Sequence, residues 1–240
     1  MSRRLIAVSG PSGVGKGPII EWTKKAYPNL CQVKVRKEKT ERYKGTEDDL
    51  GFNGKEGEFY SFDCRGTEQR IYLNEIIKAI DNNEIVLLEM YYKAFDFLKQ
   101  VKELYEPVSQ FTSINFDITS VFISPLDMTD IENLSKQDKR LEDYLPDLML
   151  DSLIKRAERD GKSFTHSLLR ELEMRAEDSV NEIKFAHNYR QIIPNHSYES
   201  DSRWKFPILV GEPLRVVKSL KEIIERGNSD YAYKGEDYKI

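Results

Sequence analysis

The chain has 240 residues, of which 39% are hydrophobic and 32% are charged, and its formal net charge is −4. This length suffices for one large domain, or one domain with insertions, around a buried core. The slightly acidic balance argues against a nucleic-acid-binding protein, and no apolar stretch approaches the roughly eighteen residues of a membrane span.

The N-terminus leads directly into an apolar segment and lacks the pattern of a secretory signal peptide. The two cysteines, Cys31 and Cys64, have neither metal-ligand spacing nor a disulfide framework, so we expect both to be packing residues. These features favour a protein of the reducing cytoplasm that binds neither nucleic acid nor a membrane.

The first predicted strand, Leu5-Ile6-Ala7-Val8, is followed by Gly-Pro-Ser-Gly-Val-Gly-Lys-Gly at residues 10–17. This is a G-x-x-x-x-G-K phosphate-binding loop, and a helix predicted from Pro18 to Tyr27 completes the strand–loop–helix context. Backbone N–H groups of such a loop surround phosphate oxygens, and Gly10, Gly13 and Gly15 can adopt positive φ angles. The pattern predicts a site for ATP with Mg²⁺. The loop residues expected to bind the nucleotide are Ser12, Gly13, Val14, Gly15, Lys16 and Gly17.

The loop departs from the motif immediately after its lysine. Ser or Thr normally follows and binds Mg²⁺ through its hydroxyl, but here Gly17 and Pro18 follow. Proline is accepted in the first turn of a helix but has no N–H to donate to a phosphate. Adenylate kinases also have glycine after the lysine but place threonine next, so only Gly17 has that precedent.

Short apolar runs alternate with helical patterns along the rest of the chain. Strands are predicted at 31–35, 58–64, 85–88 and 120–123, and helices at 72–80, 93–104 and 167–188 and from Pro213 to a stop at Gly227. Residues 37–57 have the composition of a charged loop, and residues 228–240 that of a polar, frayed tail. This alternation predicts an α/β phosphate-loop fold in three layers with a parallel core sheet.

The segment from Leu5 to Lys16 closely resembles the opening of guanylate kinases. Three later segments resemble motifs of that family and follow in the same order. Lys39-Thr40-Glu41-Arg42 resembles its R-x-P-R motif, and the segment from Tyr72 to Glu89 resembles its Y-G-T motif, the helix after it and its L-L-E-I-D strand. The segment from Arg175 to Asn195 resembles its R-L…E…Y-D…V-N pattern. The resemblance implies a core of residues 1–31, 72–125 and 190–227, an acceptor-binding insertion at about 32–71 and a lid at about 155–175.

The activity that this resemblance implies is in-line phosphoryl transfer from ATP to a nucleoside monophosphate, with GMP or dGMP the first expectation. Such catalysis depends on positioning and charge neutralisation. Lys16 and Arg175 would be catalytic, Asn195 would border the adenine, and Arg159 would belong to the lid. The structural alternatives to these functional roles are a surface ion pair of Arg175 with Glu171 or Glu182, and a position in a turn for Asn195.

On the acceptor side the resemblance implies that Lys39 and Arg42 clamp the acceptor phosphate and that Tyr60 and Tyr72 touch it. Glu89 would orient water bound to Mg²⁺, with no direct side-chain ligand to the metal. A solvated charged loop is the alternative for the Lys39–Arg42 segment. Packing is the alternative for the two tyrosines.

Several positions depart from the family. Tyr91 stands where guanylate kinases have aspartate, Val35 where they have serine, and none of Glu58, Asp63 or Glu68 has a convincing context for reading guanine. Two rival functions therefore stay open: a kinase for another small phosphate ester, and a guanylate-kinase-like binding module without catalysis. The three histidines lack ligand spacing and receive no role.

Overall fold

The computed structural model describes residues 3–37, 58–103, 116–238 and 240. The chain divides into two compact units. Unit 1 combines the segment up to Val8 with Pro28–Thr119, and unit 2 combines Ser9–Tyr27 with the chain from Ser120 onward.

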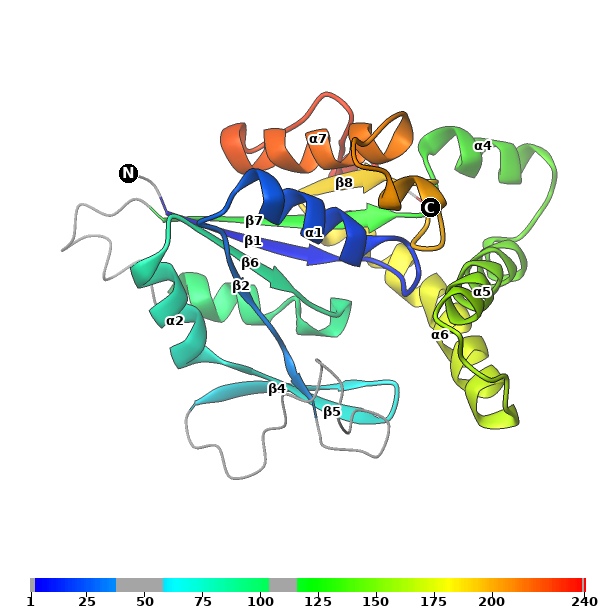
Figure 1. The fold of residues 1–240 in the computed structure, drawn as a ribbon, viewed down its shortest axis with the longest axis horizontal. Helices are drawn as coiled ribbons and strands as arrows, with labels where there is room; N and C mark the ends of the chain where they lie inside the picture. Colours follow the sequence, from blue (N-terminus) through cyan, green and yellow to red (C-terminus); the bar gives the residue numbers. More distant parts are fainter. Residues whose placement is uncertain (1–2, 38–57, 104–115, 239) are drawn as a thin grey trace. The chain divides into compact units, whose positions relative to one another are not determined.

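Unit 1 contains parallel strands with helix α2 (Leu73–Asn82) beside them (Figure 1). Strands β1 (Arg3–Ser9) and β2 (Cys31–Val33) both pair with β6 (Ile85–Glu89). Ser9, the last residue of β1, belongs to unit 2. Residues Leu5 to Val8 are completely buried, which explains the uninterrupted apolar run of a strand covered on both faces. Helix α2 (Leu73–Asn82) turns Ile76 and Ile80 into the core next to β2 and β6.

Unit 1 also contains a small antiparallel sheet of β3 (Arg36–Lys37), β5 (Thr67–Tyr72) and β4 (Phe59–Cys64). A two-residue turn joins β4 to β5, with positive φ at Arg65 (56°) and Gly66 (77°), which is the geometry that a tight hairpin requires. The sequence predicted β4 but missed β5, because the alternation of Thr67–Tyr72 is dominated by polar residues.

Unit 2 contains β8 (Gln191–Pro194), β9 (Tyr233–Lys234) and the later part of β7 (Phe116–Ser124). The residues of β7 from Ser120 onward belong to this unit. Helix α1 (Lys16–Ala26) lies against α7 (Glu212–Arg226), and α5 (Leu141–Arg159) lies against α6 (His166–Lys184) (Figure 1). Helix α4 (Met128–Lys136) begins at a capping box, in which Asp127 and Asp130 accept hydrogen bonds from each other's backbone N–H. In α6, Leu172, Ala176 and Ile183 are buried.

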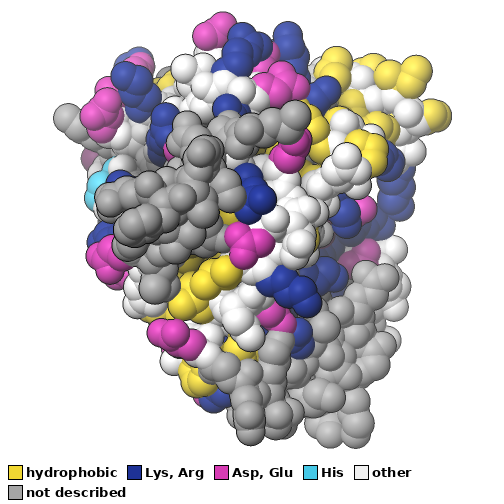
Figure 2. Space-filling model, turned by 90° about the vertical axis from the view of Figure 1, so that its left-hand side faces the viewer, with side chains coloured by type: hydrophobic (Ala, Val, Ile, Leu, Met, Phe, Trp, Pro, Cys, Tyr) yellow, Lys and Arg dark blue, Asp and Glu magenta, His cyan; other side chains and the backbone are white. Residues whose placement is uncertain are grey.

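The principal sheet has six strands in the order β2-β6-β1-β7-β8-β9. Its described strand pairs are parallel except β8 with β9. The expected α/β fold with a mostly parallel core sheet is therefore confirmed. None of the described helices has the length and apolarity needed to cross a membrane. On the face drawn in Figure 2, acidic and basic side chains are intermixed, in keeping with the small net charge.

Several element boundaries differ from the sequence-based expectations, among them the end of α6, which lies at Lys184 instead of residue 188. Helix α1 begins two residues before Pro18, and β7 begins before the predicted residue 120. The helix expected over 93–104 is instead a short 3-10 turn, η2 (Tyr92–Ala94), followed by a helix that the structure describes over residues 97–103.

The expectation of a frayed tail after residue 227 was wrong. Strand β9 pairs antiparallel with β8, and Tyr238 is 1% exposed, with its hydroxyl 2.6 Å from Ser124 Oγ. A Cβ at Gly235 would collide with the carbonyl of Tyr189, so only glycine allows this close approach. Polar composition was misleading here because the tail completes a sheet edge through backbone hydrogen bonds and buries one tyrosine.

Candidate functional site

The loop between β1 and α1 has the conformation that its glycines predict. The φ angles are 143° at Gly10, 87° at Gly13 and 101° at Gly15, all in the region that favours glycine. A Cβ at Gly10 would collide with the carbonyl of Ile123 in β7. At Gly13 it would lie 3.2 Å from both Ser152 Oγ and Leu153 Cδ2 of α5. The loop is thus held close to a strand and a helix that follow it by more than a hundred residues.

Lys16 turns its ammonium back into this loop. Its Nζ donates hydrogen bonds to the carbonyls of Gly10 at 2.5 Å and Pro11 at 2.9 Å. The lysine therefore folds back over its own loop, and a phosphate oxygen could replace a carbonyl as acceptor. Ser12, also predicted to bind nucleotide, is partly exposed in the same loop.

Asn195 is bonded to the backbone of the phosphate loop. Its Nδ2 donates to the carbonyls of Val14 at 2.6 Å and Ser197 at 3.0 Å, and its Oδ1 accepts from the N–H of Ser197. The side chain is completely buried, and a Cβ at Gly15 would lie 2.8 Å from its Nδ2. In this arrangement both amide atoms of Asn195 bond the backbone, and one of these bonds holds the phosphate loop.

Residues 195–199, named here the strap, continue across the loop. The backbone N–H of Glu199 donates to the carbonyl of Gly13 at 3.0 Å, and Ser152 Oγ donates to the same carbonyl at 3.0 Å. Strap and helix α5 thus meet at one loop residue. Sequence reasoning missed this meeting, because neither Ser152 nor Glu199 lies in a motif.

Two arginines of α5 reach the strap. Arg156 Nη1 lies 2.9 Å from Glu199 Oε2, and Arg159 donates to the backbone carbonyl of Glu199. Arg159 was predicted as a lid residue. Both arginines are thereby tied to a segment that contacts the phosphate loop.

Arg175 is placed differently from these two arginines. Its Nη2 lies 2.8 Å from Glu171 Oε1, one turn earlier in α6, as in the ion-pair alternative. Its side chain is 19% exposed. Of the two helices α5 and α6, α5 makes the described contacts with the loop, whereas Arg175 of α6 is engaged within its own helix.

The loop's fit for Mg²⁺ depends on what replaces the missing hydroxyl. Gly17 and Pro18 offer none, but a Cβ at Gly17 would lie 3.7 Å from Glu199 Oε1. A carboxylate oxygen is a ligand type that Mg²⁺ prefers. The residues present therefore fit a magnesium–nucleotide complex, with Glu199 as the acidic group beside the loop.

The acceptor-side candidates lie in unit 1. Tyr72 is 1% exposed, with its ring 5.7 Å from Phe59 and 5.9 Å from the guanidinium of Arg36, so it has the contacts of a packing residue. Tyr60 is partly exposed beside Phe97. Glu89 ends β6 opposite Val8 in the strand register. Lys39 and Arg42 lie outside the described residues.

Tyr91, which replaces the family's aspartate, belongs to an aromatic cluster in unit 1. Its ring stacks on Phe62 at 6.4 Å, and the guanidinium of Arg65 lies 5.0 Å above it. The ring is 8% exposed. Position 91 is therefore a packed aromatic site that offers no carboxylate to a metal.

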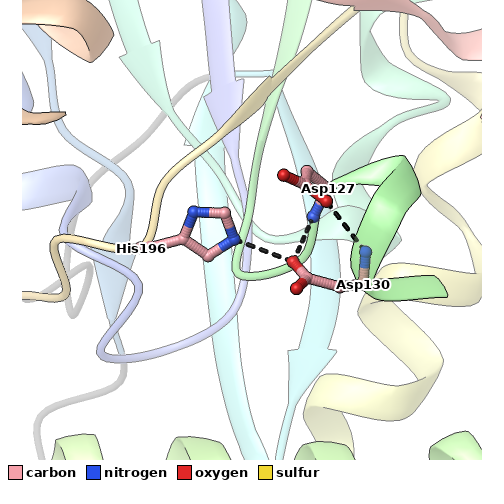
Figure 3. A group of neighbouring side chains, drawn as sticks. All are labelled: Asp127, Asp130 and His196. Atoms are coloured by element: carbon pink, nitrogen blue, oxygen red, sulfur yellow. Dashed lines mark hydrogen bonds and ion pairs between the residues drawn. The ribbon is translucent and has the colours of Figure 1, made fainter. Parts of the chain in front are cut away.

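His196, to which the sequence assigned no role, joins three acidic residues in unit 2. Figure 3 shows its ring directed at Asp130 beside Asp127, and its Nε2 lies 2.8 Å from Asp130 Oδ2. Its Nδ1 lies 3.7 Å from Glu212 Oε1. Glu212 and Asp130 together raise the pKa of His196 to about 9, and His196 lowers the pKa of Glu212 to about 2.

This cluster is satisfied without a metal ion. The carboxylates of Asp127 and Asp130 already accept the backbone N–H groups of the α4 capping box. The imidazolium of His196 lies between Asp130 and Glu212 and offsets part of their negative charge. The group therefore joins the strap to the starts of α4 and α7.

Comparison with solved structures gives distant likenesses. The chain is similar to the crystal structure of polyphosphate kinase 2 from Arthrobacter aurescens TC1, at 13% identity and a TM-score of 0.42, over 96% of this chain and 71% of that one. No protein-family model and no curated protein sequence matches the chain.

Proposed function

We propose that this protein is an ATP-dependent kinase that transfers a phosphoryl group to a nucleoside monophosphate, with GMP or dGMP the first candidate. The observation that carries the proposal is the phosphate loop: positive φ at Gly10, Gly13 and Gly15, with the Lys16 ammonium bonded to the carbonyls of Gly10 and Pro11. A loop of this geometry presents backbone N–H groups and one mobile cation to a triphosphate.

The chain's own residues divide the work between holding the loop and neutralising charge. Asn195 and the strap keep the loop in shape, while Lys16 follows the transferring phosphoryl group. Mg²⁺ bound with ATP would lie beside Glu199 and would supply positive charge that neutralises the charge developing during transfer. Arg156 and Arg159 are the cations that α5 brings to the strap, and Arg175 becomes available only if its pair with Glu171 opens.

For the acceptor we propose Lys39 and Arg42 as the phosphate clamp, because an arginine can hold a phosphate with two parallel hydrogen bonds. Tyr60, with its partly exposed ring, is a better candidate for contact with the acceptor than the buried Tyr72. Glu89 is proposed to act on magnesium through water. The segment 155–175 is proposed to act as a lid that closes over both substrates and excludes water.

The test is a coupled assay of ADP release from ATP against a panel of nucleoside monophosphates and other small phosphate esters. Turnover of GMP or dGMP on the order of 1–100 per second supports the proposal. If only a different phosphate ester is turned over, the protein is a kinase but its acceptor is that ester instead of GMP or dGMP. Absence of ADP release with the whole panel, in protein that still binds ATP, refutes catalysis.

A binding module without catalysis is the second candidate, favoured by the missing hydroxyl at Gly17 and Pro18 and by the aromatic Tyr91. The double substitution Gly17→Ser with Pro18→Thr separates the two. In an active kinase it should change turnover by about tenfold at most, because the native site already works. In a module, the parent should release no ADP, while the substituted protein binds Mg·ATP more tightly.

A further inference from the structure

The position that normally ligates magnesium in this loop has no side chain of its own. Gly17 and Pro18 follow Lys16, and neither carries an oxygen donor. The Cβ that a serine would have at position 17 lies 3.7 Å from Glu199 Oε1. A carboxylate from a distant segment therefore lies next to the place where the hydroxyl is missing.

Glu199 is also fixed in the frame of the loop. Its backbone N–H donates to the carbonyl of Gly13 at 3.0 Å, and its side chain is 18% exposed. The neighbouring strap residue Ser197 is held by Asn195, whose amide also bonds Val14. The backbone of Glu199 is thus bonded to the phosphate loop, so the start of its side chain has a set position relative to the loop.

The charge of Glu199 is balanced by one cation. Arg156 Nη1 lies 2.9 Å from its Oε2, and the same guanidinium lies 3.8 Å from Asp160 Oδ2. A carboxylate this close to the loop would repel a bare triphosphate. A magnesium–nucleotide complex brings a cation for the carboxylate and an anion for the guanidinium, so both charges of the pair stay compensated.

We propose that Glu199 is the metal-facing residue of this loop and takes the part of the missing hydroxyl. This inference rests on the proposed ATP site. Oxygen anions are the ligands that magnesium takes, directly or through its water. The loop should therefore bind Mg·ATP more tightly than free ATP, although Gly17 and Pro18 provide no side-chain ligand for the metal.

The experiment measures the dissociation constant of ATP for the full chain by calorimetry, without acceptor, once in Mg²⁺ and once in EDTA. The wild type should bind at least about tenfold more tightly in Mg²⁺, as expected for a charge-assisted contact. In Glu199→Gln this advantage should fall by about tenfold, while binding in EDTA stays equal or becomes tighter because a negative charge is removed. Glu158→Gln, an exposed position on α5, is the matched control and should behave as wild type.

The outcomes separate the inference from the function on which it rests. A wild type that binds no ATP in either buffer refutes the proposed site, and the inference falls with it. A Glu199→Gln variant that keeps the magnesium advantage, or weakens ATP equally in both buffers, overturns the inference alone. Glu199→Asp retains the charge on a shorter arm and should keep part of the advantage. This variant tests the same point should Glu199→Gln fail to fold.

Discussion

Asn195 and Val14 are 181 residues apart, yet the Asn195 amide donates to the Val14 carbonyl at 2.6 Å in a completely buried contact. This bond joins the end of β8 to the middle of the phosphate loop. The loop's shape is consequently a property of unit 2 as a whole, in addition to being a property of its glycines.

Replacing Asn195 by alanine should therefore affect both stability and ATP binding. The change leaves the Val14 carbonyl and the Ser197 backbone without their partner, at about 1–3 kcal/mol for a buried unsatisfied group. For a chain of this size each kcal/mol lowers the melting temperature by about 2–4 °C. Thermal unfolding and ATP calorimetry check this. An unchanged melting temperature with unchanged ATP affinity would contradict the loop-shaping role.

The Lys16→Met variant should lose turnover by a factor on the order of 10³, because it removes the cation at the transferring phosphate. Steady-state ADP release with saturating ATP and acceptor is the measurement. Lys24→Met, on the exposed part of α1, is the control and should retain wild-type rates. Full activity of Lys16→Met would remove Lys16 from the catalytic assignment.

Arg42→Ala should raise the KM for the acceptor far more than the KM for ATP, since the proposed clamp holds the acceptor phosphate. A fall in kcat is also expected if the contact tightens in the transition state. Initial rates with each substrate varied in turn separate these effects. Equal effects on both substrates, or none, would favour the solvated-loop interpretation of residues 39–42.

The His196 cluster should make stability depend on pH in the alkaline range. The folded pKa of about 9 exceeds the ordinary value of 6.5, so the folded state holds the proton more tightly. This stabilisation is complete below pH 6.5 and is lost as pH rises through 9. His196→Gln should flatten the fall in melting temperature between pH 6.5 and 9, relative to wild type. An identical slope in both proteins would dissociate His196 from this stabilisation.

The ordered tail predicts a measurable effect of Tyr238→Phe. The hydroxyl of Tyr238 bonds Ser124 and the Leu126 carbonyl in a buried site, and its loss should cost about 1–3 kcal/mol. Urea unfolding monitors the change. Tyr144→Phe, which makes the same chemical change at a position that is 36% exposed, should be neutral. Equal stability of both variants would support the earlier expectation that the tail is frayed.

The sequence by itself determined the phosphate loop and the fold class. Both are local signals: three glycines and a lysine at set spacing dictate backbone angles, and buried parallel strands appear as short apolar runs. The strand β5 escaped because its polar residues mask the alternation, and the Arg65-Gly66 turn was the available clue.

The tertiary structure decided which side chains surround that loop. Glu199 meets Arg156 across 43 positions and His196 meets Asp130 across 66, and no spacing rule links such residues. It also bonded Asn195 to the phosphate loop, paired Arg175 with Glu171, and ordered the tail against β8. The physical reason is the same in each case: ion pairs and buried hydrogen bonds form between groups that folding brings together, and their energies depend on burial and geometry, which the sequence does not encode locally.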